Sequence, residues 1–65
     1  MLITVNGQNT QVDDGTTVAG LLASLDYPDR GIAVAVDATV LPKSRWGEPV
    51  PAGATIEVLT AVQGG

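Results

Sequence analysis

The sequence contains no cysteine and no histidine. Without cysteine it has no disulfide, no thiolate metal ligand and no thiol nucleophile. Without histidine it lacks the general base of Ser-His and Cys-His catalysis and a typical zinc site. The seven carboxylates are scattered, except for the pair Asp13-Asp14, so they form no paired acid and base. We therefore expect a protein that is not an enzyme and that binds no metal or cofactor of its own.

Aromatic and basic residues are also scarce. Tyr27 and Trp46 are the only aromatic side chains, so the core must be aliphatic. The net charge of −4 disfavours nucleic acid and anionic membranes as partners and suits a protein with a basic docking face. No apolar run approaches the roughly 18 residues of a membrane span, and Met1 is not followed by a basic signal region. We expect a cytoplasmic protein with neither nucleic acid nor membrane as partner.

The first third of the chain predicts a hairpin. Leu2–Val5 is rich in β-branched residues, and Asn6-Gly7 is typical of a type I′ turn because both residues tolerate a positive φ. The return strand is expected over about residues 8–12. Ile3 and Val5 should face the core, with Leu2 and Thr4 on the opposite face of the sheet.

A short helix should follow the hairpin. Val18, Leu21, Leu22 and Leu25 recur at helical spacing and form one apolar stripe. Thr16 or Thr17 can cap its N-terminus. Pro28 is expected to end the helix, because proline disfavours the helical conformation of the preceding residue.

A second hairpin is predicted from Ile32 to Leu41. Alternation puts Ile32, Val34 and Val36 on the helix side of a strand, and Ala33 and Ala35 on the other side. Asp37-Ala38 is the expected turn, residues 39–41 begin the return strand, and Pro42 ends it. Further along, Trp46 is interpreted as a lid over the edge of a small core.

The last apolar run, Ile56 to Val62, is the expected central strand. Ile56 and Val58 should face the helix, which leaves Leu59 and Ala61 on the outer face. The element order predicts an α+β fold of the β-grasp type: a mixed sheet of four to five strands, the last paired with the first, and one helix on one face. We expect one domain over residues 1–62 and a flexible tail over residues 63–65.

The sequence closes on Gln63-Gly64-Gly65. Glycine has no Cβ, so a Gly-Gly tail can enter a slot too narrow for a side chain. The carboxylate of Gly65 can serve as an adenylation substrate, since ATP turns a poor acyl donor into a mixed anhydride.

The chain resembles the ThiS family, the bacterial sulfur carriers of thiamine biosynthesis, over essentially its whole length. The pieces that carry the resemblance occur in order: Asn6-Gly7, Thr17-Val18-Ala19, Leu21-Leu22, Val34-Ala35-Val36, Pro42-Lys43-Ser44-Arg45-Trp46, Ile56-Glu57-Val58 and Ala61-Val62-Gln63-Gly64-Gly65. Two positions depart from the family pattern. Asp37 stands where asparagine is usual, and Ala54 stands where aspartate is usual. Both are expected in turns, so they leave the chemistry of the tail untouched.

The resemblance implies a ubiquitin-like fold and a cycle run by partner enzymes. An adenylating, ThiF-type enzyme would use ATP and Mg²⁺ to activate Gly65, with Gln63 and Gly64 threaded through its active site. Sulfur from a donor such as a cysteine desulfurase would replace AMP and leave a thiocarboxylate. A ThiG-type thiazole synthase would then accept the sulfur. The body would dock through an apolar patch that comprises Leu59, Ala61, Leu2, Ala33 and Ala35.

Two alternatives remain open at the level of sequence. The chain could carry sulfur for another pathway, such as molybdopterin synthesis, cysteine synthesis or tRNA thiolation. It could instead be a β-grasp interaction module with no chemistry at its tail, similar to the TGS regulatory domains.

Overall fold

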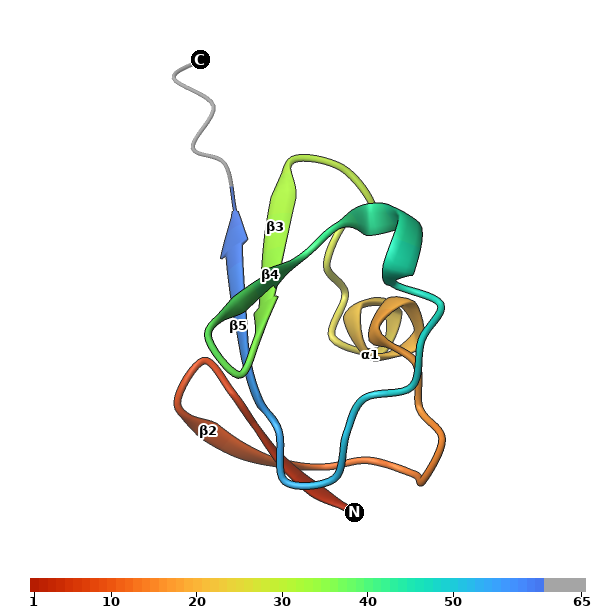
Figure 1. Cartoon of the computed structure of the whole chain (residues 1–65), viewed down its shortest axis with the longest axis vertical. Helices are drawn as coiled ribbons and strands as arrows, with labels where there is room; N and C mark the ends of the chain where they lie inside the picture. The colour runs from red at the N-terminus through yellow and green to blue at the C-terminus, as the bar shows by residue number, and fades with distance from the viewer. Residues whose placement is uncertain (61–65) are drawn as a thin grey trace.

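Five strands form one mixed sheet in a computed structural model of the chain, which describes residues 1–60 (Figure 1). The strand order is β2-β1-β5-β3-β4, with β1 and β5 parallel and the other neighbours antiparallel. The strands are β1 (Leu2–Val5), β2 (Gln8–Gln11), β3 (Ile32–Val36), β4 (Thr39–Leu41) and β5 (Thr55–Thr60). The helix α1 (Val18–Ser24) lies on one face of the sheet, and a 3-10 turn, η1 (Lys43–Arg45), follows β4.

This arrangement is the predicted β-grasp, and the last strand pairs with the first as expected. The predicted domain boundary after residue 62 and the flexible tail over residues 63–65 lie outside the described residues.

The core lies between α1 and the inner face of the sheet. Among the strand residues predicted to face inward, Ile3, Val5, Val34, Ile56 and Val58 are buried. Ile32 and Val36 are only partly buried and pack against the edge of the core. The buried strand residues pack with the helix residues Val18, Leu21 and Leu22 and with Trp46, Val50 and Ala54. Ala54 ends a turn and is itself 2% exposed, so the residue that departs from the family pattern fills space in the core.

The helix begins where predicted but ends early. Thr17 caps the N-terminus, because its Oγ1 accepts a hydrogen bond of 3.0 Å from the Gly20 N–H. At the other end, Asp26 adopts a left-handed φ of 62°. The Asp26 N–H donates to the Ala23 carbonyl, and the Tyr27 N–H donates to the Leu22 carbonyl. These two hydrogen bonds are the pair that defines a Schellman motif.

The expectation that Leu25 belongs to the buried stripe and that Pro28 ends the helix is therefore wrong. The Schellman motif ends the helix at Ser24 and leaves Leu25 38% exposed.

The loop after η1 supplies hydrogen-bond acceptors to the N-terminus of α1. The Val18 and Ala19 N–H groups donate to the carbonyls of Glu48 and Trp46 at 3.2 and 2.9 Å. Trp46 is 7% exposed, and its Nε1–H donates to the Leu41 carbonyl at 3.2 Å. The interpretation of Trp46 as a lid over the core is confirmed. Within residues 1–60, α1 is the one α-helix, and its seven residues are too few to cross a membrane.

Candidate functional site

The strand β5 has different neighbours along its length. Its first residues pair with β1 at Thr4↔Thr55 and Val5↔Ile56. On its other side β3 accompanies it throughout, from Val36↔Ile56 to Ile32↔Thr60. Beyond Ile56, therefore, β3 is the only strand paired with β5 among the described residues. Figure 1 shows this as the upper part of β5 beside β3 alone.

Asn6 takes the place of a strand next to Val58. It has a left-handed φ of 49°, and its N–H donates to the Ile56 carbonyl at 2.9 Å. Its Oδ1 accepts from the Val58 N–H at 2.8 Å, while its Nδ2 donates to the Val58 carbonyl at 3.4 Å. The same Nδ2 lies 3.2 Å from the Tyr27 hydroxyl. One amide side chain thus continues the β1–β5 ladder by one step.

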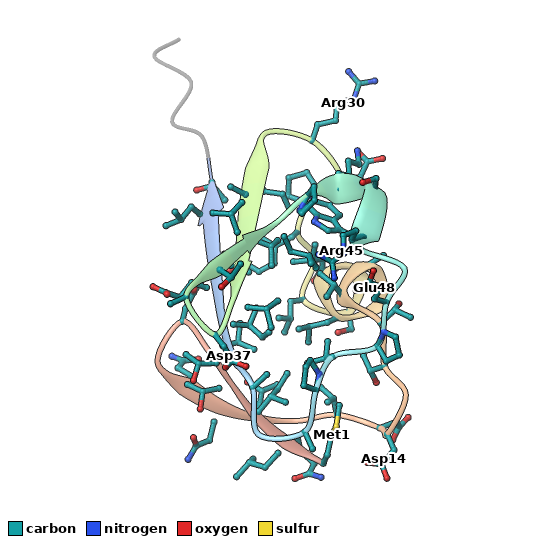
Figure 2. The ribbon with its side chains drawn as sticks, viewed as in Figure 1. Met1, Asp14, Arg30, Asp37, Arg45 and Glu48 are labelled. Carbon is teal, nitrogen blue, oxygen red and sulfur yellow. The ribbon has the colours of Figure 1, made fainter. Side chains whose placement is uncertain are left out.

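Asp37 holds the opposite edge of β5 at its start. It also has a left-handed φ, 50°, and its N–H donates to the Thr55 carbonyl at 2.8 Å. Its Oδ1 accepts from the Thr55 N–H at 2.9 Å. Figure 2 shows Asp37 at the tip of the β3–β4 hairpin. The two hairpin turns therefore fix β5 from both sides.

The face of the sheet opposite α1 carries a group of apolar side chains. Register places Leu59 beside Ala33, and Val40 beside Ala35. Leu59 is 65% exposed and Val40 is 70% exposed, while Ala33 is exposed and Ala35 is half-buried. We call these four residues the outer patch. A hollow of about 300 Å³, lined by Gly31, Ile32, Ala33, Leu59 and Thr60, lies at its edge.

The structure brings together only part of the predicted docking face. Leu59, Ala33 and Ala35 are neighbours, whereas Leu2 lies elsewhere on the same face. The Gly53 N–H donates to the Leu2 carbonyl, so Leu2 is level with a residue six positions before Leu59. At 3.3 Å per residue, that separates Leu2 from Leu59 by about 20 Å. Ala61, Gln63, Gly64 and Gly65 lie outside the described residues.

Val40 is the member of the outer patch that the sequence reasoning missed. The signal was present: Val40 stands between Thr39 and Leu41 in a strand, so it faces away from its two neighbours. An inward Leu41 implies an outward Val40. The face of this residue could have been assigned from alternation alone.

Charged groups near the sheet are sparse and exposed. Arg45 donates to Glu48 through Nε and Nη2 at 2.9 and 3.0 Å (Figure 2). These hydrogen bonds hold the pKa of the Glu48 carboxyl below its ordinary value. Within residues 1–60 no cluster of three or more carboxylates lies close enough together to hold a metal ion.

The sequence and the fold of this chain are both similar to those of known proteins. The ThiS family model matches residues 3–65. The crystal structure of the thiamine biosynthesis protein ThiS from Geobacter metallireducens superposes with a TM-score of 0.77 at 29% identity, covering 100% of both chains. A solution structure of a thiamine biosynthesis protein from the same organism gives a TM-score of 0.78 at 29% identity, covering 100% of this chain and 88% of that one. No curated protein matches the sequence.

Proposed function

Because this chain belongs to the ThiS family, we propose that it is a sulfur carrier for the thiazole of thiamine. Its cargo would be held as a thiocarboxylate on the terminal carboxyl carbon of Gly65. The observation that carries the proposal is the family match, which runs through residue 65 and so includes the Gly-Gly end.

The proposed chemistry is supplied by partners. An adenylating, ThiF-type enzyme with ATP and Mg²⁺ joins AMP to the Gly65 carboxylate and releases pyrophosphate. A persulfide derived from a cysteine desulfurase then displaces AMP and forms the C–S bond, and a thiol reductant cleaves the remaining S–S bond to leave the thiocarboxylate. A ThiG-type thiazole synthase takes the sulfur. This chain contributes a carboxyl group, a thin tail of Gln63 and Gly64, and a body that partners recognise, and it acts as a substrate of these enzymes in the cytoplasm.

The outer patch is the proposed docking surface for the adenylating enzyme. Transient protein interfaces combine an apolar centre with a polar rim. Leu59 is 65% exposed and lies beside Ala33 of β3 in the register of the sheet. Glu57 and Thr60 on the same strand supply polar groups at the border. Leu59 also belongs to the last strand and precedes Gly65 by six residues in the sequence, so a protein that binds Leu59 binds the strand that leads to the tail.

Mass spectrometry tests the chemistry. Incubation with the adenylating enzyme of the same organism, ATP, Mg²⁺ and a sulfur source should raise the intact mass by about 16 Da, the exchange of one carboxylate oxygen for sulfur. A chain lacking Gly65 is the control and should stay unchanged. A full-length chain that gains no mass in the complete mixture would refute the proposal.

A genetic test separates the pathways. A strain without this protein should grow when the thiazole precursor of thiamine is supplied. Growth only with cysteine, or only with a molybdopterin precursor, would assign the carrier to another pathway. A strain whose growth is restored by the chain without Gly65 would favour an interaction module.

A matched pair of variants tests the docking surface. Leu59→Glu should weaken binding to the adenylating enzyme by about tenfold or more, because it puts a charge at the centre of an apolar contact. Leu2→Glu is the control, since Leu2 is also exposed on this face but lies about 20 Å away. Calorimetric titration measures both, and circular dichroism checks the fold. Equal losses in the two variants would place the contact elsewhere.

A further inference from the structure

The backbone groups of β5 alternate between its two edges. Those of Thr55 bond to Asp37 on the β3 side, whereas the Ile56 carbonyl and both Val58 groups bond to Asn6 on the β1 side. Successive residues of a strand direct their N–H and C=O to opposite edges. Thr60, two residues after Val58, therefore directs its N–H and C=O to the β1 side.

That side is open next to Thr60. The strand β1 pairs with β5 only as far as Val5↔Ile56, and the amide of Asn6 covers the next step at Val58. Among residues 1–60, no hydrogen bond joins the backbone of Thr60 to a group on this side. In Figure 1 the upper part of β5 has no strand on the side away from β3. Thr60 thus presents an unpaired strand edge.

We propose that an extended segment of the adenylating enzyme pairs with Thr60 and adds a strand to this edge. The proposal rests on the function proposed above. An unpaired N–H and C=O on one strand edge are matched by the backbone of a second extended chain. The site also adjoins the outer patch, because Leu59 is the residue next to Thr60 in the same strand. A partner seated on Leu59 reaches the open edge without a further contact surface.

Asn6 determines where the open edge of β5 begins. It ends the β1–β5 pairing in a turn and satisfies Val58 with a side chain instead of a strand. A longer β1 would cover Thr60 and leave nothing for a partner backbone. The added strand would hold the following residues extended, which is the conformation that a chain needs to enter a narrow active-site channel.

Amide hydrogen exchange tests the pairing in the unaltered protein. The Thr60 amide should exchange readily in the free chain and slow by about tenfold or more when the adenylating enzyme is present in excess. The Val58 amide, which Asn6 already holds, is the internal reference and should change little. An unprotected Thr60 amide in a complex that has formed would overturn the proposal.

Two variants at one position isolate the backbone donor. Thr60→Pro removes the N–H, and the β3 ladder should survive because this N–H faces away from β3. Thr60→Val retains the N–H and alters only the side chain. We expect Thr60→Pro to raise the Kd for the adenylating enzyme by about tenfold and Thr60→Val by less than about twofold. Equal Kd values for the two variants would contradict strand addition.

The outcomes distinguish this inference from the proposed function. Normal thiocarboxylate formation with an unprotected Thr60 amide would overturn the inference alone. Absence of thiocarboxylate from every mixture would overturn the function. Protection of Thr60 that rises with the concentration of the free chain, together with a dimer in sedimentation, would assign the edge to a second copy and overturn the partner pairing.

Discussion

The two hairpin turns of this small sheet invite comparison. Asn6-Gly7 joins β1 to β2, and Asp37-Ala38 joins β3 to β4; all four residues have a positive φ. In each turn the first residue donates its N–H to a carbonyl of β5 and accepts an N–H of β5 on its side chain. Two turns of different sequence thus hold the central strand β5 with the same kind of hydrogen bonds.

The turns differ in what their side chains can do. The Asn6 amide accepts from the Val58 N–H and also donates, to the Val58 carbonyl and the Tyr27 hydroxyl. The Asp37 carboxylate can only accept, and its contact reaches Thr55, where β5 begins. Only an amide offers the donor and acceptor pair of a peptide group. Asn6 therefore replaces a strand, whereas Asp37 adds a single contact.

The largest predicted difference in stability is between two single variants, each of which truncates the first side chain of one turn to alanine. Asn6→Ala should lower the free energy of unfolding by about 2 kcal/mol, because the buried Val58 loses its partner and alanine is disfavoured at a positive φ. Asp37→Ala should cost less, about 1 kcal/mol, since Thr55 is exposed. Urea denaturation measures both. Equal costs would mean that the two turns hold β5 with the same strength.

Exchanging the two chemistries sharpens the comparison. Asn6→Asp keeps the acceptor for the Val58 N–H but sets a carboxylate against the Val58 carbonyl, and should cost about 1 kcal/mol. Asp37→Asn keeps the acceptor for the Thr55 N–H and should fall within about 0.5 kcal/mol of the parent. The same denaturation series checks this pair. A costly Asp37→Asn would show that its charge, and not its acceptor, matters.

Substitutions at the second residue of the two turns should have effects of opposite sign. Ala38 has a φ of 70°, a conformation that disfavours a side chain, so Ala38→Gly should raise the free energy of unfolding by about 0.5 kcal/mol. Gly7→Ala should lower it by about 1 kcal/mol. No atom lies within 4 Å of a Cβ added at Gly7, so backbone conformation alone is tested. Thermal unfolding checks both, and a destabilised Ala38→Gly would contradict the argument.

The smallest effect is expected outside both turns. Arg45 and Glu48 form an exposed ion pair, with side chains 58% and 50% exposed. Their hydrogen bonds lower the pKa of Glu48, so the pair stabilises the fold above the ordinary carboxyl pKa and is lost as the pH falls through the lowered one. Glu48→Gln should lower Tm slightly at neutral pH, by less than any change in the turns.

Acidification provides the control for that pair. At a pH below the lowered pKa of Glu48, the parent and Glu48→Gln should melt together. A gap in Tm that persists in acid would show that the loop is held by something other than this ion pair.

Local patterns in the sequence predicted most of the fold, but they did not predict where the helix ends. Alternation placed Ile3, Val34, Ile56 and Val58 inside, and each is buried. Helical spacing also drew Leu25 into the stripe, but spacing says nothing about where a helix stops. That depended on Asp26 adopting a left-handed φ, which is uncommon for a residue other than glycine.

The candidate site was less accessible to sequence reasoning. Alternation assigns a residue to a face of the sheet but not to a position along that face. The sequence analysis therefore put Leu2 and Leu59 in one docking patch, although the register of β1 and β5 sets them far apart. The function of Asn6 was equally hidden, because the pair Asn-Gly predicts a turn and not which strand the amide will meet. Both points depend on how β1 and β5 are aligned, which is a property of the assembled sheet.

The position of β5 has a consequence for synthesis in the cell. It is the last of the described strands to emerge from the ribosome, yet it joins the β1–β2 hairpin to the β3–β4 hairpin at the centre of the sheet. Until it emerges, the nascent chain has two hairpins with no common neighbour, and non-local pairing of this kind is slow to form. Prematurely terminated translation products should therefore stay unfolded and be degraded by proteases. Folded copies then accumulate only once this strand has been synthesised.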